Sequence, residues 1–160
     1  MKTIPVSGGL FALVDDEDEA LVSRYSWSPL RRARTVYARA YIRGSQPARC
    51  VSLHQLLLDT PQGMEIDHKD GDGLNNQRNN IRVVTPSQNM QNARKRCSNG
   101  GRPTHSSYKG VTWQGGRHNS WKCMVGHIFI GYFDSETEAA QAYNKAALVH
   151  FGKFARLNVL

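Results

Sequence analysis

The chain has 160 residues, 39% of them hydrophobic, and a formal net charge of +8 at pH 7, which allows one domain or two small ones with small cores. Its three cysteines have no CxxC spacing, which argues against a structural zinc site and against a disulfide framework. No apolar run is long enough to span a bilayer, and no signal peptide is expected before Ile4, so we expect a cytoplasmic protein without a membrane partner.

The first 50 residues predict a small module made mainly of strands. Residues 4–6 and 10–14 have strand composition, residues 15–25 predict a short helix, and residues 27–30 and 35–43 predict an antiparallel hairpin. In the second hairpin strand Arg39 and Arg43 share one face, which suits contact with phosphates. A solvent-exposed sheet face would show the same pattern, so both interpretations stay open.

Residues 51–58 predict a buried helix, because Leu53, Leu56 and Leu57 have helical spacing. The same run contains His54. A structural or phosphate-contacting role is favoured for this histidine over a catalytic one.

The segment 64–96 predicts a strand, a polar loop, a second strand and a helix. Asp67 and His68 end the first strand, and residues 81–84 form the second. Thr85 is a good helix N-cap, with Pro86 at the first helical position and Gln88 at the third. Asn80 precedes the second strand, and Asn89 follows in the first turn of the helix.

This pattern suits hydrolytic chemistry with one divalent ion. Asp67 and the side-chain carbonyl of Asn89 are oxygen ligands of the kind that a hard cation such as Mg²⁺ or Mn²⁺ prefers. Neighbours in a strand point to opposite faces, so His68 faces away from Asp67. An imidazole with a pKa near neutrality can take a proton from water there.

Simpler interpretations exist for each residue taken alone. Asp67, Asn80 or Asn89 could each be a turn or capping residue, and DGDGLNN could be mistaken for a calcium loop. It lacks the bidentate Glu that an EF-hand loop needs at its twelfth position. The joint spacing and the strand–helix context favour the functional interpretation.

At these residues the sequence resembles the HNH (His-Me finger) endonucleases, most closely the homing type encoded by phages and introns. The resemblance implies that His68 is the general base, that Asp67 and Asn89 bind the metal, and that Asn80 orients the finger and the histidine. This chain has Asn where the family name implies a second His.

The layout of charge predicts double-stranded DNA as the partner. Residues 20–58 contain seven Arg and no acid, and residues 73–133 contain nine Lys or Arg and no acid. Long tracts of one sign suit a polyanion better than mutual pairing. Arg94, Lys95 and Arg96, which end the finger helix, are candidate DNA contacts. No protein partner is evident, and we expect a monomer or a weak dimer.

Residues 97–107 are rich in Gly, Pro and Ser and predict a linker, after which the sequence changes character. Residues 109–114, 120–125 and 128–133 predict three strands, and a capping box at 135–138 predicts a helix that ends at Gly152. The pieces YKGV, SWKCMV, IGYFDSETEAAQAYNKAAL and FGKFARLNVL resemble the Apetala-type (ethylene-response-factor) DNA-binding domain. That resemblance implies that the sheet enters the major groove. The candidate contacts are Lys109, Trp113, Arg117, Trp121 and Lys122.

Together these features predict an α+β protein of two modules. Residues 1–96 would form an HNH endonuclease domain, with a ββα-metal finger at 64–96 and a small β-rich N-terminal module. Residues 108–160 would form a three-stranded antiparallel sheet packed on one helix and would recognise the DNA site. The alternative is a DNA-binding or regulatory protein whose finger has lost catalysis.

Overall fold

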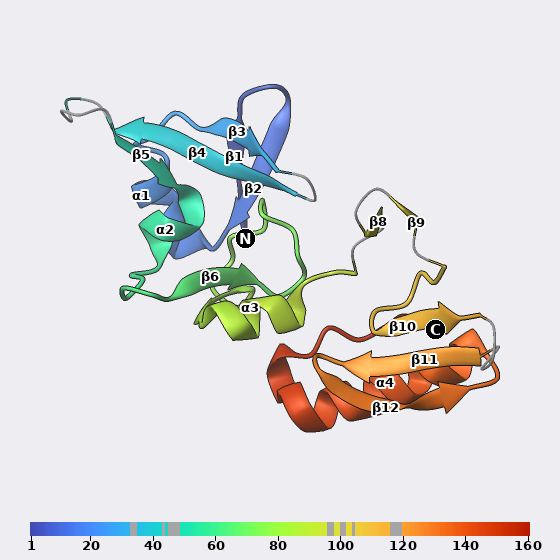
Figure 1. Cartoon of the computed structure of the whole chain (residues 1–160). Helices are drawn as coiled ribbons and strands as arrows, with labels where there is room; N and C mark the ends of the chain where they lie inside the picture. Colours follow the sequence, from blue (N-terminus) through green and yellow to red (C-terminus); the bar gives the residue numbers. More distant parts are fainter. Residues whose placement is uncertain are drawn as a thin grey trace. The chain divides into compact units, whose positions relative to one another are not determined.

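The computed structural model describes residues 1–32, 35–42, 44, 49–95, 98–99, 102–103, 105–115 and 120–160 (Figure 1). Three candidate DNA contacts, Arg43, Arg96 and Arg117, lie outside these residues. The chain divides into two compact units, Met1–Asn89 and Met90–Leu160, which are described separately below. The domain boundary at residues 97–107 stays a prediction.

The N-terminal part of the first unit consists of a hairpin and a three-stranded sheet. The hairpin pairs β1 (Lys2–Val6) with β2 (Leu10–Val14), and its turn places Gly8 and Gly9 at positive φ, where a side chain would be strained. The sheet has the antiparallel order β3-β4-β5, with bounds Ser28–Arg31, Val36–Ile42 and Arg49–Ser52. Between hairpin and sheet lie a short 3₁₀ turn, Asp16–Asp18, and α1 (Glu19–Val22).

The predicted helix at 51–58 begins two residues later than expected. Residues 49–52 instead form β5, because they pair with β4. The helix α2 (Leu53–Leu57) starts at a capping box in which the Ser52 and Gln55 side chains each bond the other residue's backbone N–H. Leu53 and Leu57 face the core, as the helical spacing predicts, whereas Leu56 is only partly buried.

The core of the first unit joins the hairpin, α1, the sheet and the finger. Alternate residues of β1 and β2 point inward, so that Ile4 and Val6 pack with Ala12 and Val14. The other buried members are Val22, Trp27, Ala38, Ala40, Leu53, Leu57 and Ile81. Ile81 belongs to the predicted second finger strand, so the finger is anchored in the same core as the N-terminal module.

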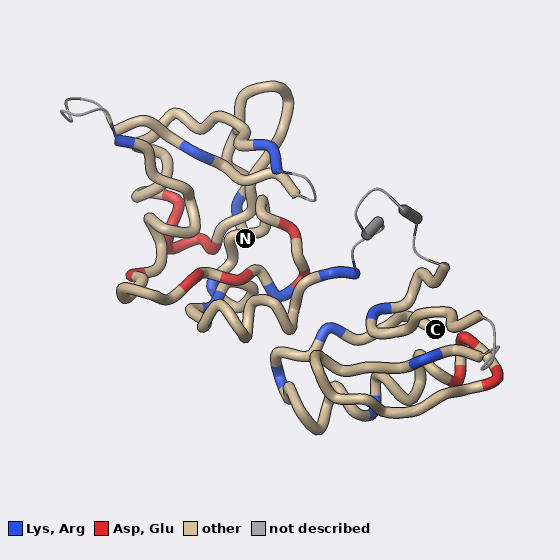
Figure 2. Tube along the Cα trace, in the orientation of Figure 1, with Lys and Arg blue, Asp and Glu red and all other residues tan. Residues whose placement is uncertain are grey.

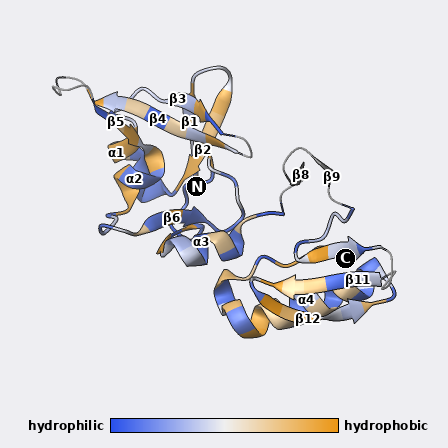
Figure 3. Ribbon diagram, viewed as in Figure 1, coloured by the Kyte–Doolittle hydropathy of each residue, from blue (hydrophilic) through white to orange (hydrophobic). Residues whose placement is uncertain are grey.

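The finger segment contains an antiparallel strand pair and a helix. β6 (Glu65–His68) pairs with β7 (Ile81–Val84), and α3 (Pro86–Asn92) follows. The helix begins as its sequence predicts: the Thr85 N–H donates to Gln88 Oε1 at 2.9 Å, and the Gln88 N–H donates to Thr85 Oγ1 at 3.2 Å. In Figure 3 the residues around β6 are mostly hydrophilic, unlike the strands of the N-terminal hairpin.

The second unit contains a three-stranded antiparallel sheet and one long helix. The sheet has the order β10-β11-β12, with bounds Val111–Gln114, Ser120–Val125 and Ile128–Phe133. α4 (Glu136–Phe151) begins at Ser135, whose Oγ accepts the Glu138 N–H, and is followed by a 3₁₀ turn, Gly152–Phe154. Two short strands, β8 (Ser98–Asn99) and β9 (Arg102–Pro103), pair within the predicted linker.

Small residues on α4 let the helix lie close to this sheet. Ala139, Ala140 and Ala147 are fully buried, and they form one core with Tyr143 and with Val111, Cys123 and Val125 of the sheet. Gly110 has a positive φ and fits under Tyr143, since a Cβ there would lie 2.2 Å from Tyr143 Cδ2. None of the helices in the described parts of the chain is long and apolar enough to cross a membrane.

Candidate active site

Asp67 and His68 occupy the end of β6, where the alternation of the strand sends them to opposite faces. Asp67 lies across from Arg82 in the β6–β7 register, and His68 lies across from Ile81. Both residues are almost completely buried, each with 5% of its surface exposed. The strand therefore presents a carboxylate on one side and an imidazole on the other.

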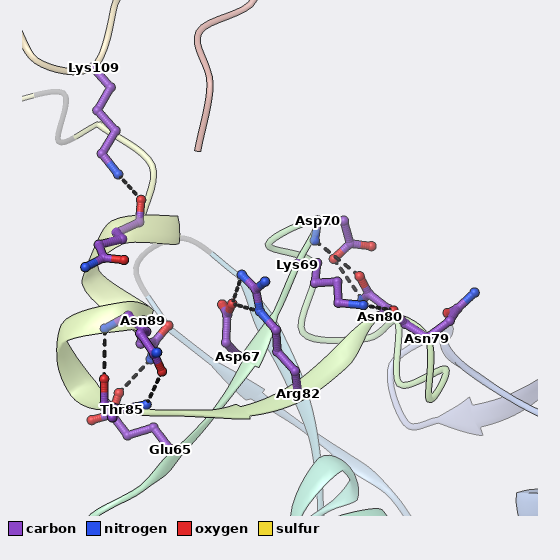
Figure 4. Close-up of polar contacts among 12 residues, drawn as sticks. Glu65, Asp67, Lys69, Asp70, Asn79, Asn80, Arg82, Thr85, Asn89 and Lys109 are labelled. Atoms are coloured by element: carbon purple, nitrogen blue, oxygen red, sulfur yellow. Dashed lines mark hydrogen bonds and ion pairs between the residues drawn. The ribbon is translucent and has the colours of Figure 1, made fainter. Parts of the chain in front are cut away.

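The Asp67 carboxylate forms an ion pair with Arg82 (Figure 4). Both Nε and Nη2 of Arg82 donate to Asp67 Oδ2, at 2.9 and 2.7 Å. The Arg82 side chain is itself only 14% exposed. A guanidinium thus supplies the positive charge that a buried carboxylate needs.

The second predicted ligand, Asn89, hydrogen bonds to a residue on the Asp67 side of β6. Its Nδ2 donates to Glu65 Oε2 at 2.6 Å, and Glu65 shares a strand face with Asp67, two residues away. Because this bond uses the amide NH₂, Oδ1 is the Asn89 atom suited to a cation.

These three residues supply oxygen donors only, which fits Mg²⁺ or Mn²⁺ better than zinc. Among the residues that the structure describes, no group of three or more His, Cys, Asp or Glu side chains could hold a metal. The fit therefore depends on combining two carboxylates, Glu65 and Asp67, with the amide oxygen of Asn89.

His68 is packed among aromatic rings and bonded to an asparagine that sequence reasoning missed. The ring centroid of His54 lies 5.2 Å from that of His68, and the Tyr37 centroid lies 5.7 Å away. His68 Nε2 lies 3.2 Å from Asn76 Oδ1. Burial lowers the pKa of His68, against the opposing effects of Asn76 and the nearby carboxylates, so the imidazole is neutral at physiological pH.

Asn80, which the HNH resemblance assigns to orienting the histidine, bonds to the loop between β6 and β7. Its Nδ2 donates to Asp70 Oδ1 at 3.0 Å and to the Asn75 carbonyl at 2.8 Å, and its Oδ1 accepts the Asp70 N–H at 3.2 Å. Burial raises the pKa of Asp70, but hydrogen bonds from the Asp72 backbone, Asn80 and Asn75 outweigh it and leave the pKa lowered. Asn80 therefore organises the loop that carries Asn76.

That loop, residues 69–80, is tethered to the N-terminal module. The Leu13 N–H donates to the Leu74 carbonyl, and the Asn76 N–H donates to the Leu13 carbonyl, each at 2.8 Å. Arg78 makes a two-point ion pair with the buried Asp18, with distances of 2.7 and 3.0 Å. Further tethers are the Arg78 N–H to Asp15 Oδ2, Gln77 Nε2 to Asp15 Oδ1, the Gly73 N–H to Thr35 Oγ1, and an ion pair between Arg78 Nε and Glu17 Oε1 at 3.1 Å.

His54 lies beside His68 as a partly buried, neutral ring. Within the described residues, its Nδ1 is buried without a hydrogen-bond partner. Burial lowers its pKa from 6.5 to about 4, with a smaller contribution from the charge of His68. This setting fits the structural role that the sequence favoured.

Acidification should therefore destabilise the first unit partly through His54. Because the folded-state pKa is about 4 and the unfolded value 6.5, the unfolded chain binds the proton first, and stability falls as the pH drops through this window. The shift corresponds to about 3 kcal/mol, at about 1.4 kcal/mol per pKa unit. Urea unfolding at pH 7 and pH 4 should show a smaller acid loss for His54→Gln than for the wild type. The exposed His150→Gln should keep the full loss, and equal losses in all three proteins would contradict this role.

The side chains predicted to contact DNA differ in the groups that they contact within the protein. On β4, Arg39 lies with its guanidinium carbon 5.4 Å from the centre of the Tyr41 ring, and its Nε is buried. In the second unit, Lys95 Nζ donates to the Val111 carbonyl at 2.7 Å, and Arg94 lines a surface pocket together with Lys95 and Lys109.

Lys109 is bonded to backbone at the end of α3. Its Nζ donates to the Gln91 carbonyl and, at 2.7 Å, to the Ala93 carbonyl, and burial lowers its pKa to about 8, with a further contribution from Arg156. The amines of Lys95 and Lys109 thus satisfy carbonyls within their own unit, which makes both residues weaker candidates for phosphate contact.

The two tryptophans lie on the sheet face that packs against α4. Trp113 and Trp121 are register partners with ring centroids 5.0 Å apart, and they share a face with Val111 and Cys123 of the core. Lys122 lies on the other face, opposite Tyr132 in the register. Tyr132 and Phe129 are exposed and contact each other, with ring centroids 5.2 Å apart.

Comparison with known proteins identifies the family of the finger segment. Residues 59–91, which include β6, β7 and most of α3, match the model of a family described as HNH endonuclease. Over 94% of its length the chain is 30% identical to an uncharacterised HNH endonuclease of Acanthamoeba polyphaga mimivirus, covering 75% of that protein. No solved structure matches the chain.

The chain belongs to the HNH endonuclease family and is a nuclease. The HNH part of the predicted resemblance is therefore confirmed. The Apetala-type resemblance of residues 108–160 is not supported by these matches and stays a prediction.

Proposed function

We propose that the protein is a homing-type DNA endonuclease that hydrolyses phosphodiester bonds with one Mg²⁺ or Mn²⁺ ion. The observation that carries the proposal is the pairing of Asp67 and His68 on opposite faces of β6, each buried and each held by a specific partner. One side of the strand offers oxygen ligands, and the other offers a neutral imidazole. The enzyme would act in the cytoplasm as a monomer or weak dimer.

The roles follow from the chemistry of the side chains. Asp67, Asn89 and Glu65 would hold the ion, which supplies charge stabilisation at the scissile phosphate and the leaving oxygen. His68 accepts a proton from the attacking water. Arg82, which pairs with Asp67, supplies a second positive charge beside the ligands, and Asn80 keeps the loop in shape.

Supercoiled plasmid DNA tests this function directly. The purified full chain should convert the plasmid to nicked or linear forms with Mg²⁺ or Mn²⁺, and EDTA should stop the reaction. The alternative, a regulatory DNA-binding protein without catalysis, predicts a gel shift without strand cleavage under every metal condition. Binding without cleavage in both metals would reject the proposal.

We also propose that the second unit contributes site recognition through the sheet face that α4 leaves uncovered. Lys122, Tyr132 and Phe129 lie on this face, so it combines a cation with exposed aromatic rings. The major groove of B-form DNA is wide enough to admit β structure. Trp113 and Trp121 would support the sheet from its other side and not contact bases directly.

Replacing Lys122 with alanine should weaken DNA binding by the full chain in a salt-dependent way. A lost phosphate contact lowers the slope of log affinity against log salt by about 0.9. Fluorescence anisotropy on duplex DNA at several salt concentrations measures this slope. The matched control is Lys145→Ala on the exposed side of α4, which removes the same charge and should leave the slope unchanged. Equal slopes for both variants would reject this face as the reader.

A further inference from the structure

Asn76 is fully buried in the loop between β6 and β7, with 0% of its surface exposed. Its side chain makes three polar contacts. Nδ2 donates to the Leu74 carbonyl at 3.0 Å and to the Gly73 carbonyl at 3.4 Å, and Oδ1 lies 3.2 Å from His68 Nε2. Its backbone N–H bonds to Leu13, so the loop is fixed at this residue.

These contacts determine which way the amide faces. A backbone carbonyl can only accept, so the NH₂ group must point toward Gly73 and Leu74. Rotating the amide by half a turn would place Oδ1 against two other oxygens and leave it without a donor. Asn76 Oδ1 is therefore the atom that faces His68.

An oxygen acceptor at this position determines the tautomer of the imidazole. A neutral histidine carries its single N–H on one ring nitrogen, and the other nitrogen holds the lone pair. To bond with Asn76 Oδ1, His68 must donate from Nε2. The lone pair then belongs to Nδ1, and the packed rings of Tyr37 and His54 restrict reorientation of the imidazole.

We propose that Asn76 is the positioning residue of the active site: it fixes His68 as the Nε2–H tautomer and so makes Nδ1 the basic atom. This rests on the proposed function of His68 as general base. It also differs from the sequence expectation, which gave the orienting role to Asn80. Asn80 acts one step further away, on the shape of the loop.

The chemical step balances with Nδ1 as the base. One proton of the attacking water passes to Nδ1 while the water oxygen bonds to phosphorus. The bond from phosphorus to the leaving sugar oxygen breaks, its electron pair stays on that oxygen, and a proton from solvent completes the hydroxyl. Throughout, Nε2–H keeps its bond to Asn76 Oδ1, which becomes stronger when the ring is an imidazolium.

Nitrogen NMR of the full chain labelled with ¹⁵N-histidine reads the tautomer directly. In the wild type above the pKa of His68, we expect a pyrrole-like shift for Nε2 and a pyridine-like shift for Nδ1. Asn76→Ala should shift the His68 population toward the Nδ1–H tautomer. It should also slow plasmid cleavage by at least about tenfold, because part of the roughly 10²–10⁴-fold rate contribution of a positioned base is lost. DNA affinity in EDTA should stay unchanged.

Two further variants separate tautomer control from general damage to the loop. Asn79→Ala removes an exposed asparagine of the same loop and should keep both the Nε2–H signature and the wild-type rate. Asn76→Asp keeps an oxygen acceptor for Nε2–H and should retain the tautomer even if its other bonds weaken.

Each outcome has a definite meaning. An Nδ1–H signature in the wild type would overturn the proposal, as would an unchanged tautomer in folded Asn76→Ala. If Asn76→Ala does not fold, the wild-type and Asn76→Asp spectra still decide the question. If the tautomer depends on Asn76 but His68→Ala cleaves normally, the inference about Asn76 stands and the proposed role of His68 fails.

Discussion

His68→Ala is expected to abolish plasmid cleavage and to leave DNA affinity nearly unchanged. In the proposed mechanism the imidazole acts on water, and it lies buried between Tyr37, His54 and Asn76, away from solvent-exposed contacts. Loss of a positioned general base costs about 10²–10⁴-fold in rate. Single-turnover kinetics measure the cleavage rate, and binding in EDTA measures the DNA affinity.

The control for His68→Ala must account for a lost buried ring. His68→Gln retains more of the volume and a polar group, and it should be equally inactive while unfolding near the wild-type temperature. The exposed His150→Ala on α4 removes a histidine without touching the site and should cleave normally. Cleavage by His68→Ala at the wild-type rate would remove this residue from the mechanism.

Asp67→Asn is expected to raise the Mg²⁺ concentration needed for half-maximal cleavage by at least about tenfold. Substituting a residue that only supports a metal ligand lowers metal affinity by about 10–100-fold, so substituting a ligand itself should lower it at least as much. The substitution also leaves the mostly buried guanidinium of Arg82 without its carboxylate, which adds an unpaired charge beside the proposed metal site. Asn89→Ala should shift the metal requirement in the same direction.

Metal titration of the cleavage rate, together with calorimetry of Mn²⁺ binding, measures this effect. The exposed Asp59→Asn removes the same charge outside the site and is the matched control. Arg82→Ala gives a test in the opposite direction, because it frees Asp67 from its resident cation and should not weaken metal binding. Unchanged metal dependence in both Asp67→Asn and Asn89→Ala would show that these residues are not ligands.

Local signals predicted the finger elements well. The Thr85–Gln88 capping box starts α3 where its residue types require, and the short apolar runs on either side of the polar loop located β6 and β7. Ser135 likewise starts α4. These features depend on neighbours within four residues, so a single sequence contains them. β5 was missed because its pairing with β4 is a contact between distant segments.

The functional environment was harder to predict because it depends on long-range contacts. Asn76 looks like an ordinary turn residue in DGDGLNN, and only the folded loop places it against His68. Lys95 and Lys109 look like phosphate contacts, yet their amines bond to carbonyls 16 residues away in the chain. The faces of Trp113 and Trp121 follow from the strand register, which composition does not determine.

Charge illustrates the same limit. Figure 2 shows Lys and Arg on both units, while the acids are confined to a few segments. Two acids of residues 15–19 hold the loop in place, since Asp15 and Asp18 bind Arg78. A one-dimensional charge pattern does not distinguish a ligand from a tether.

The tethers of loop 69–80 have a consequence for how such a nuclease can be recombined. The family match covers residues 59–91, but the groups that hold the loop come from Leu13, Asp15, Asp18 and Thr35. Tyr37 and His54, which pack on His68, also precede the match. The finger therefore cannot be exchanged alone. A chimera that replaces only the matched segment would carry the proposed site residues without the groups that align them. Chimeras should therefore keep the first unit, Met1–Asn89, intact, with the junction placed after the end of α3.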